Sequence, residues 1–452
     1  MKYSQATRNP YLVFLPFLLF YIAVVLFLQN NELWGDEPRH FQQVQNMLHG
    51  FFSLPAPHVE LRNGPGYPLM LLPFIAVHIP LIVLKILNAV FLYLAVVFLY
   101  KAIREMVSEK LALIVGLFFA CYYNALDFIF MLYSEVFTVF LAAFMLLLLV
   151  KAFRDGPVKK RNLYGAGFVF GYMALTKIIF GYVLLFMLLA CVLLWIINRA
   201  AVNYRKGLII CLVAFATVLP YLSYTYYLTG RIFYWGTTGG NNLYWMSSLA
   251  EDEYGSWFPD PPKDSTAGIP LTSKTSEADK GGQLNLKNRT VYITGTEDSL
   301  MAHHGKDFEE INKYTGPERD DAYKKVVMKN IKANPVKFAK NCIANVGRIL
   351  FNYPYSYTAQ KPGTLFRIPL NGIISVLMLF CLIPTLLNWR KINYAVRFVL
   401  FIALLYLGGS VFGSAEIRMF TIVVPFLLFW IAYIIQRTMK VKLKFEEDYS
   451  SK

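Results

Sequence analysis

Long apolar runs alternate with short polar segments along the whole chain, and many of them approach the roughly 20 residues that a helix needs to cross a bilayer. The pattern predicts an all-α polytopic membrane protein without internal repeats or coiled-coil heptads. About ten transmembrane helices are expected, at about 11–28, 81–100, 111–124, 134–150, 162–176, 179–198, 207–228, 366–387, 395–412 and 419–436.

The apolar run 66–80 is a special case, because it is short and contains three prolines. Each proline removes a backbone donor, which weakens a spanning helix. A helix on the membrane surface, or a re-entrant segment whose backbone is buried in protein, fits this run better than a span. Counting it as a span would also reverse the sidedness of every later loop.

Lysine and arginine between the runs fall on one side of the membrane if both termini are cytoplasmic. They lie at the N-terminus and in 101–110, 151–161, 199–206, 390–397 and 437–444. The first run is too long for a signal-peptide core and lacks a small-residue cleavage site, so we expect it to be retained as a span. The outer side then receives 29–80, a short loop near 124–134, the long segment 229–365 and the turn 413–419.

This topology divides the chain into three expected domains. They are an N-terminal transmembrane module (1–228) with a first outer loop (29–80), an extracytoplasmic segment (229–365), and a C-terminal transmembrane module with a basic tail (366–452). The middle of the extracytoplasmic segment, 250–325, is polar. Its end, near 322–352, has apolar residues at helical spacing with lysines between them, which predicts an interfacial amphipathic helix that Pro335 divides in two.

Composition excludes several classes of function. The chain is 56% hydrophobic and carries a net charge of +16. Its basic residues lie in short clusters beside apolar runs, as membrane anchoring requires, so nucleic acid is not the expected partner. The absence of GxxxxGK[ST], GxSxG and HExxH patterns excludes the common nucleotide-binding and hydrolase sites. Five scattered cysteines have no metal or disulfide spacing and are expected to be small core residues: Cys121, Cys191, Cys211, Cys342 and Cys381.

The stretch "LWGDEPRHFQQ" concentrates charge directly after the first apolar run, on the outer side. Acids at the end of a span are often solvated caps. Here Asp36 and Glu37 precede a candidate amphipathic helix with Pro38 in its first turn, where the helix dipole favours ionised carboxylates. An ionised carboxylate in a partly dry cleft can act as a general base toward a hydroxyl, which makes Asp36 and Glu37 the catalytic candidates.

Three cations are expected on the same side. Arg62, in "HVELRNGPGYPL", can bind a phosphate through bidentate hydrogen bonds or extend to lipid headgroups. Lys177 and Arg418 lie at the outer ends of their spans, against the positive-inside bias. Glu416 lies two residues before Arg418, so an internal ion pair is the alternative for that arginine.

A divalent cation is possible but no spacing demands one. Glu135 opens a span, where it is either a helix-start acid or a functional intramembrane carboxylate. The candidate ligands are Asp36, Glu37, Asp127 and Glu135. The adjacent pair His303 and His304 has no further ligands in sequence and is not a metal motif by itself.

The segments "WGDEPRHFQQVQNMLHG" and "NGPGYPLMLLPF" resemble the first outer loop of the GT-C fold glycosyltransferases, in the group that contains the aminoarabinose transferases and protein O-mannosyltransferases. "LYSEVFTVFLAAFMLLLLV", "GAGFVFGYMALTK", "YLTGRIFYWGTTGGNNLYWM", "NPVKFAKNCIANVGRILF" and "EIRMFTIVVPFLLF" look like later blocks of the group, in the same order. The resemblance covers most of the chain except roughly 250–325.

The resemblance implies a glycosyltransferase in a bacterial cytoplasmic membrane, which takes a sugar from a polyprenyl-phosphate carrier at the extracytoplasmic face. Its acceptor would be a lipid, a protein or a polysaccharide. Asp36 would be the base, Glu37 its neighbour, and Arg418, Lys177 and Arg62 the donor-phosphate ligands, although Arg62 is displaced from the position that is usual in relatives. The expected pocket also includes Arg39, His58, Tyr67, Glu135, Asn241, Asn242 and the possible stacking platforms Tyr244 and Trp245.

Three other classes compete with this interpretation. A glycan polymerase or ligase of another membrane fold would use outer-loop arginines and histidines. A secondary transporter would show paired interrupted helices in two similar halves, with charges at the midplane. A membrane scaffold would leave the one-sided acids unexplained.

Overall fold

The computed structural model describes residues 9–29, 32–33, 35–154, 156, 158–258, 296–358 and 363–438, and all regular elements in these ranges are helices. The first are α1 (Pro10–Val13), α2 (Leu15–Leu28), α3 (Glu37–Leu48), α4 (Gly66–Ala76), α5 (Leu81–Arg104), α6 (Glu109–Ala120), α7 (Tyr123–Leu126), α8 (Ser134–Ala152), α9 (Lys160–Thr176), α10 (Ile179–Ile197) and α11 (Val202–Thr229). The others are α12 (Gly239–Met246), α13 (Thr296–Ile311), α14 (Gly316–Ala333), α15 (Pro335–Phe351), α16 (Thr364–Leu387), a short 3-10 helix (Trp389–Lys391), α17 (Tyr394–Phe412) and α18 (Ile417–Thr438).

Seven described helices are long and apolar enough to cross a membrane, namely α5, α8, α10, α11, α16, α17 and α18. The expectation of an all-α membrane protein is confirmed, but the count of ten spans is not. The other three expected spans correspond to α2, α6 and α9. Helix α6 has 12 residues, or about 18 Å at 1.5 Å per residue, which is shorter than a hydrocarbon core of about 30 Å. Helix α4, from the proline-containing run, has 11 residues with Pro73 inside.

Helices α8 and α18 form the centre of the bundle. They are the most buried of the seven, and α8 packs against α5, α9 and α18. Helix α9 approaches α11 closely through Gly167 and Gly171, a small-xxx-small pair of the kind that lets membrane helices meet. A Cβ at either glycine would lie within 2.7 Å of a backbone oxygen of α11, so these two positions require glycine.

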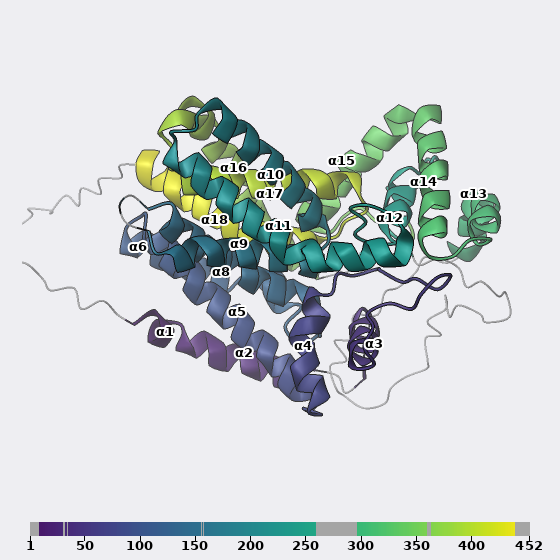
Figure 1. Cartoon of the computed structure of the whole chain (residues 1–452), viewed down its shortest axis with the longest axis horizontal. Coiled ribbons are helices and arrows are strands. Elements are labelled where there is room, and N and C mark those ends of the chain that lie inside the picture. The colour runs from purple at the N-terminus through teal and green to yellow at the C-terminus, as the bar shows by residue number, and fades with distance from the viewer. Residues whose placement is uncertain are drawn as a thin grey trace, which may run out of the picture.

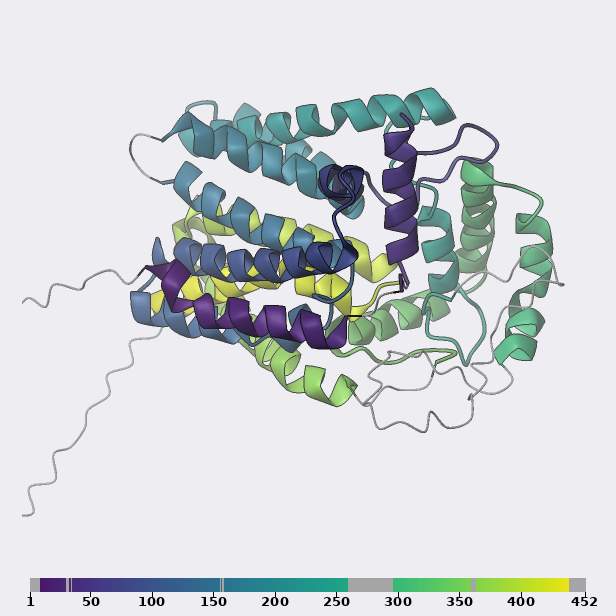
Figure 2. The ribbon, with the colours of Figure 1, turned by 90° about the horizontal axis from the view of Figure 1, so that it is seen from below.

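Four helices, α12 to α15, extend beyond one end of the bundle, which we call the pocket end because the cavity described below opens there (Figure 1). Helices α12, α13 and α14 lie there, and α15 returns from α14 to the bundle (Figures 1 and 2). The expected division at Pro335 is confirmed, because α14 ends at Ala333 and α15 begins at Pro335. A second apolar cluster, which includes Tyr244 and Trp245, holds α12, α13 and α14 together.

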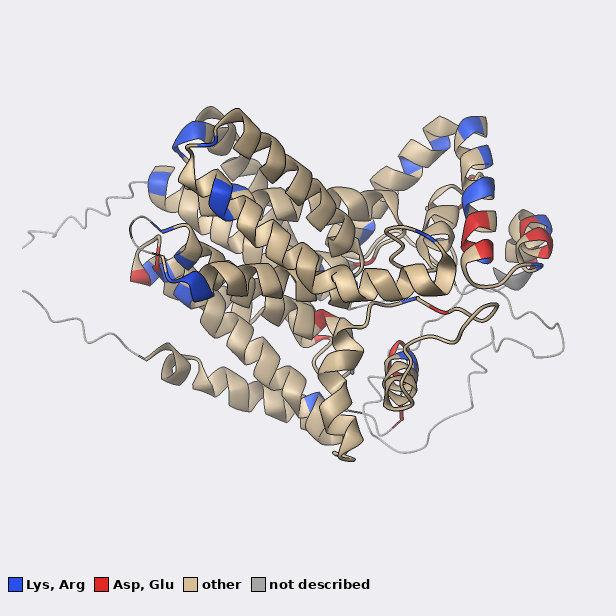
Figure 3. Ribbon diagram, in the orientation of Figure 1, with Lys and Arg blue, Asp and Glu red and all other residues tan. Residues whose placement is uncertain are grey.

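Basic residues lie at both ends of the molecule, on α14 and α15 at the pocket end and beside the bundle helices at the other end (Figure 3). The second group of lysines and arginines lies where α1 and the C-terminal end of α18 also lie (Figures 1 and 3). These include Lys101 and Arg104 at the end of α5 and Arg437 at the end of α18. This distribution agrees with the alternation of basic loops in the sequence.

Candidate active site

A cavity of about 530 Å³ opens at the pocket end. Eight separate stretches of the chain, most of them far apart in sequence, line it. Its lining includes Asp36, Arg39, Arg62, Asn63, Gly64, Ser134, Thr176, Lys177, Thr238, Asn241, Asn242, Trp257, Arg319, Ser410, Gly413, Ser414, Ala415, Glu416 and Arg418. We call this cavity the pocket.

Asp36 reaches the pocket from the N-terminus of α3. It occupies the N-cap position, but its carboxylate makes no capping hydrogen bond to its own helix. It accepts instead from Arg39 Nη1 at 3.1 Å and from Arg418 Nη1 at 2.8 Å. The preceding Gly35 has a φ of +63°, and a Cβ there would lie 1.9 Å from the Tyr133 hydroxyl, so the turn that aims Asp36 requires glycine.

Two arginines keep Asp36 ionised. Burial of the carboxyl group favours its neutral form, but the charges of Arg418 and Arg39 outweigh burial and hold the pKa of Asp36 well below its ordinary value. Asp36 is therefore an anion at neutral pH, able to accept a proton but weakly basic while both arginines contact it.

Arg418 links Asp36 to two further carboxylates. Its Nη1 lies 3.4 Å from Glu135, and its Nε lies 3.2 Å from Glu416. Lys177, at the C-terminal end of α9, donates to Glu135 at 2.7 Å. Three cations (Arg39, Lys177, Arg418) thus face three carboxylates (Asp36, Glu135, Glu416) in a charge-balanced cluster, which we call the charged cluster.

Glu37 points away from the pocket, and its prediction as a catalytic residue is corrected. Its side chain is 2% exposed and lies 3.6 Å from the Lys85 ammonium. Its Oε1 also accepts from the backbone N–H of Leu132 at 2.6 Å. Successive side chains on a helix point in different directions, so Asp36 faces the pocket while Glu37 ties α3 to α5 and to the segment before α8.

Replacing Glu37 with glutamine is expected to lower the stability of the folded protein and to leave its catalytic rate largely unchanged. The change leaves an acceptor for Leu132 but removes the carboxylate beside Lys85, and breaking a buried ion pair costs about 3–5 kcal/mol. Thermal unfolding in detergent should shift to lower temperature, while the folded protein keeps most of its turnover number. A variant with wild-type stability but no turnover would contradict the structural role.

The other predicted site residues divide into three groups. Arg39, Arg62, Asn241 and Asn242 line the pocket. Glu135 is buried and contacts the side chains of Lys177 and Arg418. Tyr67 is also fully buried, and its ring lies edge-on to the ring of His40, with 4.9 Å between the centroids. His58 is exposed on the loop before α4 and does not line the pocket.

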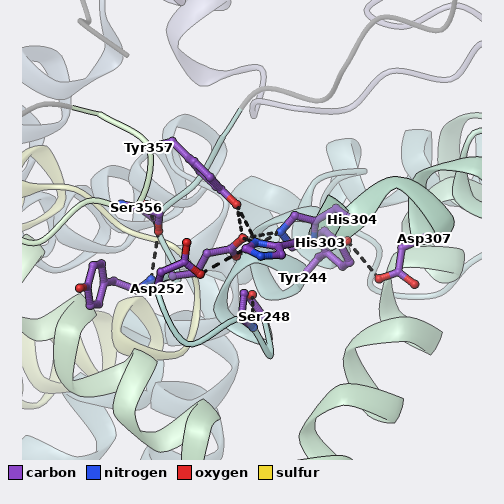
Figure 4. Close-up of polar contacts among 12 residues, drawn as sticks. Tyr244, Ser248, Asp252, His303, His304, Asp307, Ser356 and Tyr357 are labelled. Atoms are coloured by element: carbon purple, nitrogen blue, oxygen red, sulfur yellow. Dashed lines mark hydrogen bonds and ion pairs between the residues drawn. The ribbon is translucent and has the colours of Figure 1, made fainter. Parts of the chain in front are cut away.

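Tyr244 and Trp245 lie outside the pocket, which corrects their prediction as stacking platforms. A platform needs an exposed ring face, yet each residue is only 1% exposed. Both rings pack on His304 and Phe308 of α13. The Tyr244 hydroxyl lies 2.6 Å from His304 Nδ1 and donates to Asp307 at 3.1 Å (Figure 4). These aromatic residues hold α12 against α13.

Glu253 continues this network on the other side of His304. Its Oε1 lies 2.8 Å from His304 Nε2 and 3.1 Å from His303 Nδ1, and Tyr357 donates to the same oxygen. Burial opposes ionisation, but hydrogen bonds and the charge of His304 lower the pKa of Glu253 to about 2. Glu253 therefore fastens the segment after α12 to α13.

The lowered pKa of Glu253 predicts a pH dependence of stability. Because the folded-state pKa lies below the ordinary 4.5, the stabilisation is complete above about pH 4.5 and is lost as the pH falls towards 2. The difference in unfolding temperature between the wild type and Glu253→Gln should shrink between pH 6 and pH 3. A difference that does not change over this range would contradict the role of the ionised carboxylate.

Several pocket residues escaped the sequence analysis. Arg319 reaches the pocket from α14, where it also donates to Asn312 and lies over the Tyr323 ring. Trp257, 42% exposed, follows the segment that Glu253 fastens. Arg319 lies in the polar stretch 250–325, just before the amphipathic helix expected near 322–352, and an arginine there predicts by itself only a solvated surface.

The candidate metal ligands do not assemble. Asp127 pairs with Arg367 of α16, Glu37 is directed to Lys85, and Glu135 to Lys177. Within the part of the chain that the structure describes, no three His, Cys, Asp or Glu residues form a group that could hold a metal ion.

Comparison with known proteins agrees with the resemblance seen in the sequence. Residues 65–224, about a third of the chain, match the family model described as dolichyl-phosphate-mannose-protein mannosyltransferase. This match agrees with the resemblance of that part of the chain to protein O-mannosyltransferases. No curated protein matches the sequence significantly.

The solved structures that the chain is similar to are distant in sequence and only weakly similar in structure. An oligosaccharyltransferase of Archaeoglobus fulgidus, tethered with an acceptor peptide, is 13% identical over 94% of this chain and 49% of its own, with a TM-score of 0.45. ArnT from Cupriavidus metallidurans, bound to undecaprenyl phosphate, is 12% identical over 94% of this chain and 77% of its own, with a TM-score of 0.42. The chain spans about half the length of the archaeal protein, and a likeness of this degree identifies no equivalent residues.

Proposed function

We propose that the protein is an integral membrane glycosyltransferase that moves a sugar from a polyprenyl-phosphate carrier to an acceptor at the extracytoplasmic face. The convergence of Asp36 with Arg418 and Lys177 at one pocket carries this proposal, because it joins a proton acceptor to cations that suit a phosphate. The family match supports the donor class, since its description names a dolichyl-phosphate sugar. The seven apolar helices fit a lipid-borne substrate.

The proposed reaction is a single inverting displacement. The oxygen or nitrogen of the acceptor (a hydroxyl or amine on a lipid, protein or polysaccharide) attacks the anomeric carbon, and its proton passes to an Asp36 carboxylate oxygen. The bond between the anomeric carbon and the phosphate oxygen breaks, and the polyprenyl phosphate leaves with the electron pair. Arg418 and Lys177 stabilise the negative charge that develops on the phosphate, with Arg62 at the same pocket as a further ligand.

The charged cluster suggests how donor binding activates the base. Arg418 contacts Asp36, Glu135 and Glu416. A donor phosphate would draw part of that positive charge away from Asp36. The pKa of Asp36 would then rise, and the carboxylate would become a stronger base only when the donor is bound.

The extracytoplasmic location is supported by the short basic connections between the bundle helices, which gather at the end opposite the pocket end, whereas the other basic residues lie on α14 and α15 of the long outer segment (Figure 3). Site-directed labelling tests it. A cysteine at pocket-lining Ser414, in a background without the five native cysteines, is expected to react with a membrane-impermeant maleimide in right-side-out vesicles. Undecaprenyl phosphate should slow the reaction more than undecaprenol does.

A matched control uses a cysteine at Ser108, the exposed N-cap of α6 at the opposite end. It is expected to react only in inside-out vesicles. Reaction of Ser414→Cys only in inside-out vesicles would overturn the proposed face, and equal protection by the alcohol and the phosphate would overturn phosphate recognition at the pocket.

A further inference from the structure

Helix α15 has an unusual distribution of side chains. Lys337, Asn341, Asn345 and Arg348 are buried, and their spacing of four, four and three residues puts them on one face. Apolar Val336 and Ile343 on the helix are instead 65% and 73% exposed. Buried polar groups need hydrogen-bond partners, so the buried face must serve specific backbone groups of the neighbouring segments.

Asn345, which is fully buried, contacts the connection between α17 and α18. Its Nδ2 lies within hydrogen-bonding distance of the carbonyl oxygens of Ser410 (3.0 Å), Val411 (2.9 Å) and Gly413 (2.7 Å). Its Oδ1 accepts from the backbone N–H of Ala415 at 3.1 Å. An amide has two N–H groups, so the three carbonyls share them.

These contacts satisfy backbone groups that helix geometry leaves without partners. Helix α17 ends at Phe412 and α18 begins at Ile417, so the last carbonyls of one helix and the N–H groups before the other lie outside the helical ladders. One side chain from a third helix serves both ends. Asn345 thus connects the end of α17 to the start of α18.

The same connection forms a wall of the pocket. Ser410, Gly413, Ser414 and Ala415 all line it, and Arg418 follows in the first turn of α18. The backbone N–H of Ser414 also donates to the Asn242 carbonyl at 3.2 Å, which joins this wall to α12. A shift of this connection would move Arg418 relative to Asp36.

We propose that Asn345 is a positioning residue for phosphate recognition, because it fixes the 410–416 connection that sets Arg418 at the pocket. This inference rests on the proposed function only for the identity of the ligand, a polyprenyl phosphate. The positioning itself is a property of the fold and has a readout of its own.

The first test measures hydrogen–deuterium exchange of the full-length protein in detergent. Asn345→Ala removes all the side-chain bonds, and Asn345→Asp keeps the shape and the acceptor for Ala415 while removing the donors to the three carbonyls. Both variants are expected to exchange faster in 410–416. Asn341→Ala is the matched control, since Asn341 is equally buried on the same face but donates to the carbonyls of Met246 and Ser248. Its exchange should increase in 246–254 instead.

The second test measures the affinity of the same proteins for undecaprenyl phosphate. Both Asn345 variants should bind about tenfold more weakly, a loss in the range of a misplaced charge-assisted hydrogen bond. Asn341→Ala should bind within about threefold of the wild type at a similar loss of thermal stability, which separates positioning from general destabilisation.

Unchanged exchange in 410–416 in both Asn345 variants, or equal loss of affinity in Asn341→Ala, would overturn the positioning role. Arg418→Gln in the same binding assay separates the two proposals. If that variant binds undecaprenyl phosphate as the wild type does, phosphate recognition at the pocket fails, whatever the exchange results. If only the Asn345 variants bind normally, the further inference fails and the proposed function stands.

Discussion

Asp36→Asn is expected to lower the rate of sugar transfer by about 10²–10⁴-fold, the range for loss of a general base. The amide has nearly the same shape as the carboxylate and still accepts from Arg39 or Arg418, but it cannot take the proton of the acceptor. The protein should remain folded in detergent. Its affinity for undecaprenyl phosphate should not fall, because Arg418 loses an anionic competitor for the phosphate.

Single-turnover transfer and equilibrium binding measured side by side check this prediction. Glu60→Gln is the matched control, because Glu60 is an exposed carboxylate in the same loop and lies 3.7 Å from Arg62. It should transfer at close to the wild-type rate. Near-wild-type turnover by Asp36→Asn would contradict the role of Asp36 as the base.

Arg418→Gln is expected to have the second large effect. Removing one preorganised donor from a developing anion typically costs about 10²–10³-fold in turnover, and the Michaelis constant for the donor should rise because the phosphate loses a cation. Arg418→Lys keeps the charge but not the planar geometry, so it should fall between the wild type and the glutamine variant. An unchanged Michaelis constant in both variants would contradict phosphate binding by Arg418.

The same variant predicts a change in pH dependence. Arg418 lowers the pKa of Asp36, so wild-type activity should not decline between pH 7 and pH 5 through protonation of this carboxyl group. Without Arg418 the pKa of Asp36 rises, since the effect of burial is then opposed mainly by the charge of Arg39. The residual activity of Arg418→Gln should therefore fall as the pH is lowered, and a flat profile would contradict the coupling.

The sequence predicted the features that depend on periodicity and charge. The apolar runs predicted the helical membrane fold, and Pro335 predicted the break between α14 and α15. The candidate charges Asp36, Arg418 and Lys177 also converge at one site, although 382 positions separate the first two.

Other features depend on contacts that periodicity does not encode. Whether an aromatic residue in an outer segment faces a pocket or a core depends on what packs against it, and α13 buries Tyr244 and Trp245. The role of Glu37 depends on Lys85, a charged residue inside the apolar run of α5. A charge in such a run predicts a buried partner, but the sequence does not identify which residue that partner is. The role of Asn345 depends on the ends of two helices that lie 65 or more residues later in sequence.

Transfer from a defined donor tests the central claim most directly. The purified protein in lipid nanodiscs is incubated with a panel of radiolabelled polyprenyl-phosphate sugars and with lipid, protein and polysaccharide acceptor fractions. At least one donor should release its polyprenyl phosphate and label an acceptor, with the anomeric configuration inverted and with little release by Asp36→Asn. The account would be contradicted if the protein consumed none of the donors with any acceptor class, or if the wild type and Asp36→Asn consumed a donor equally.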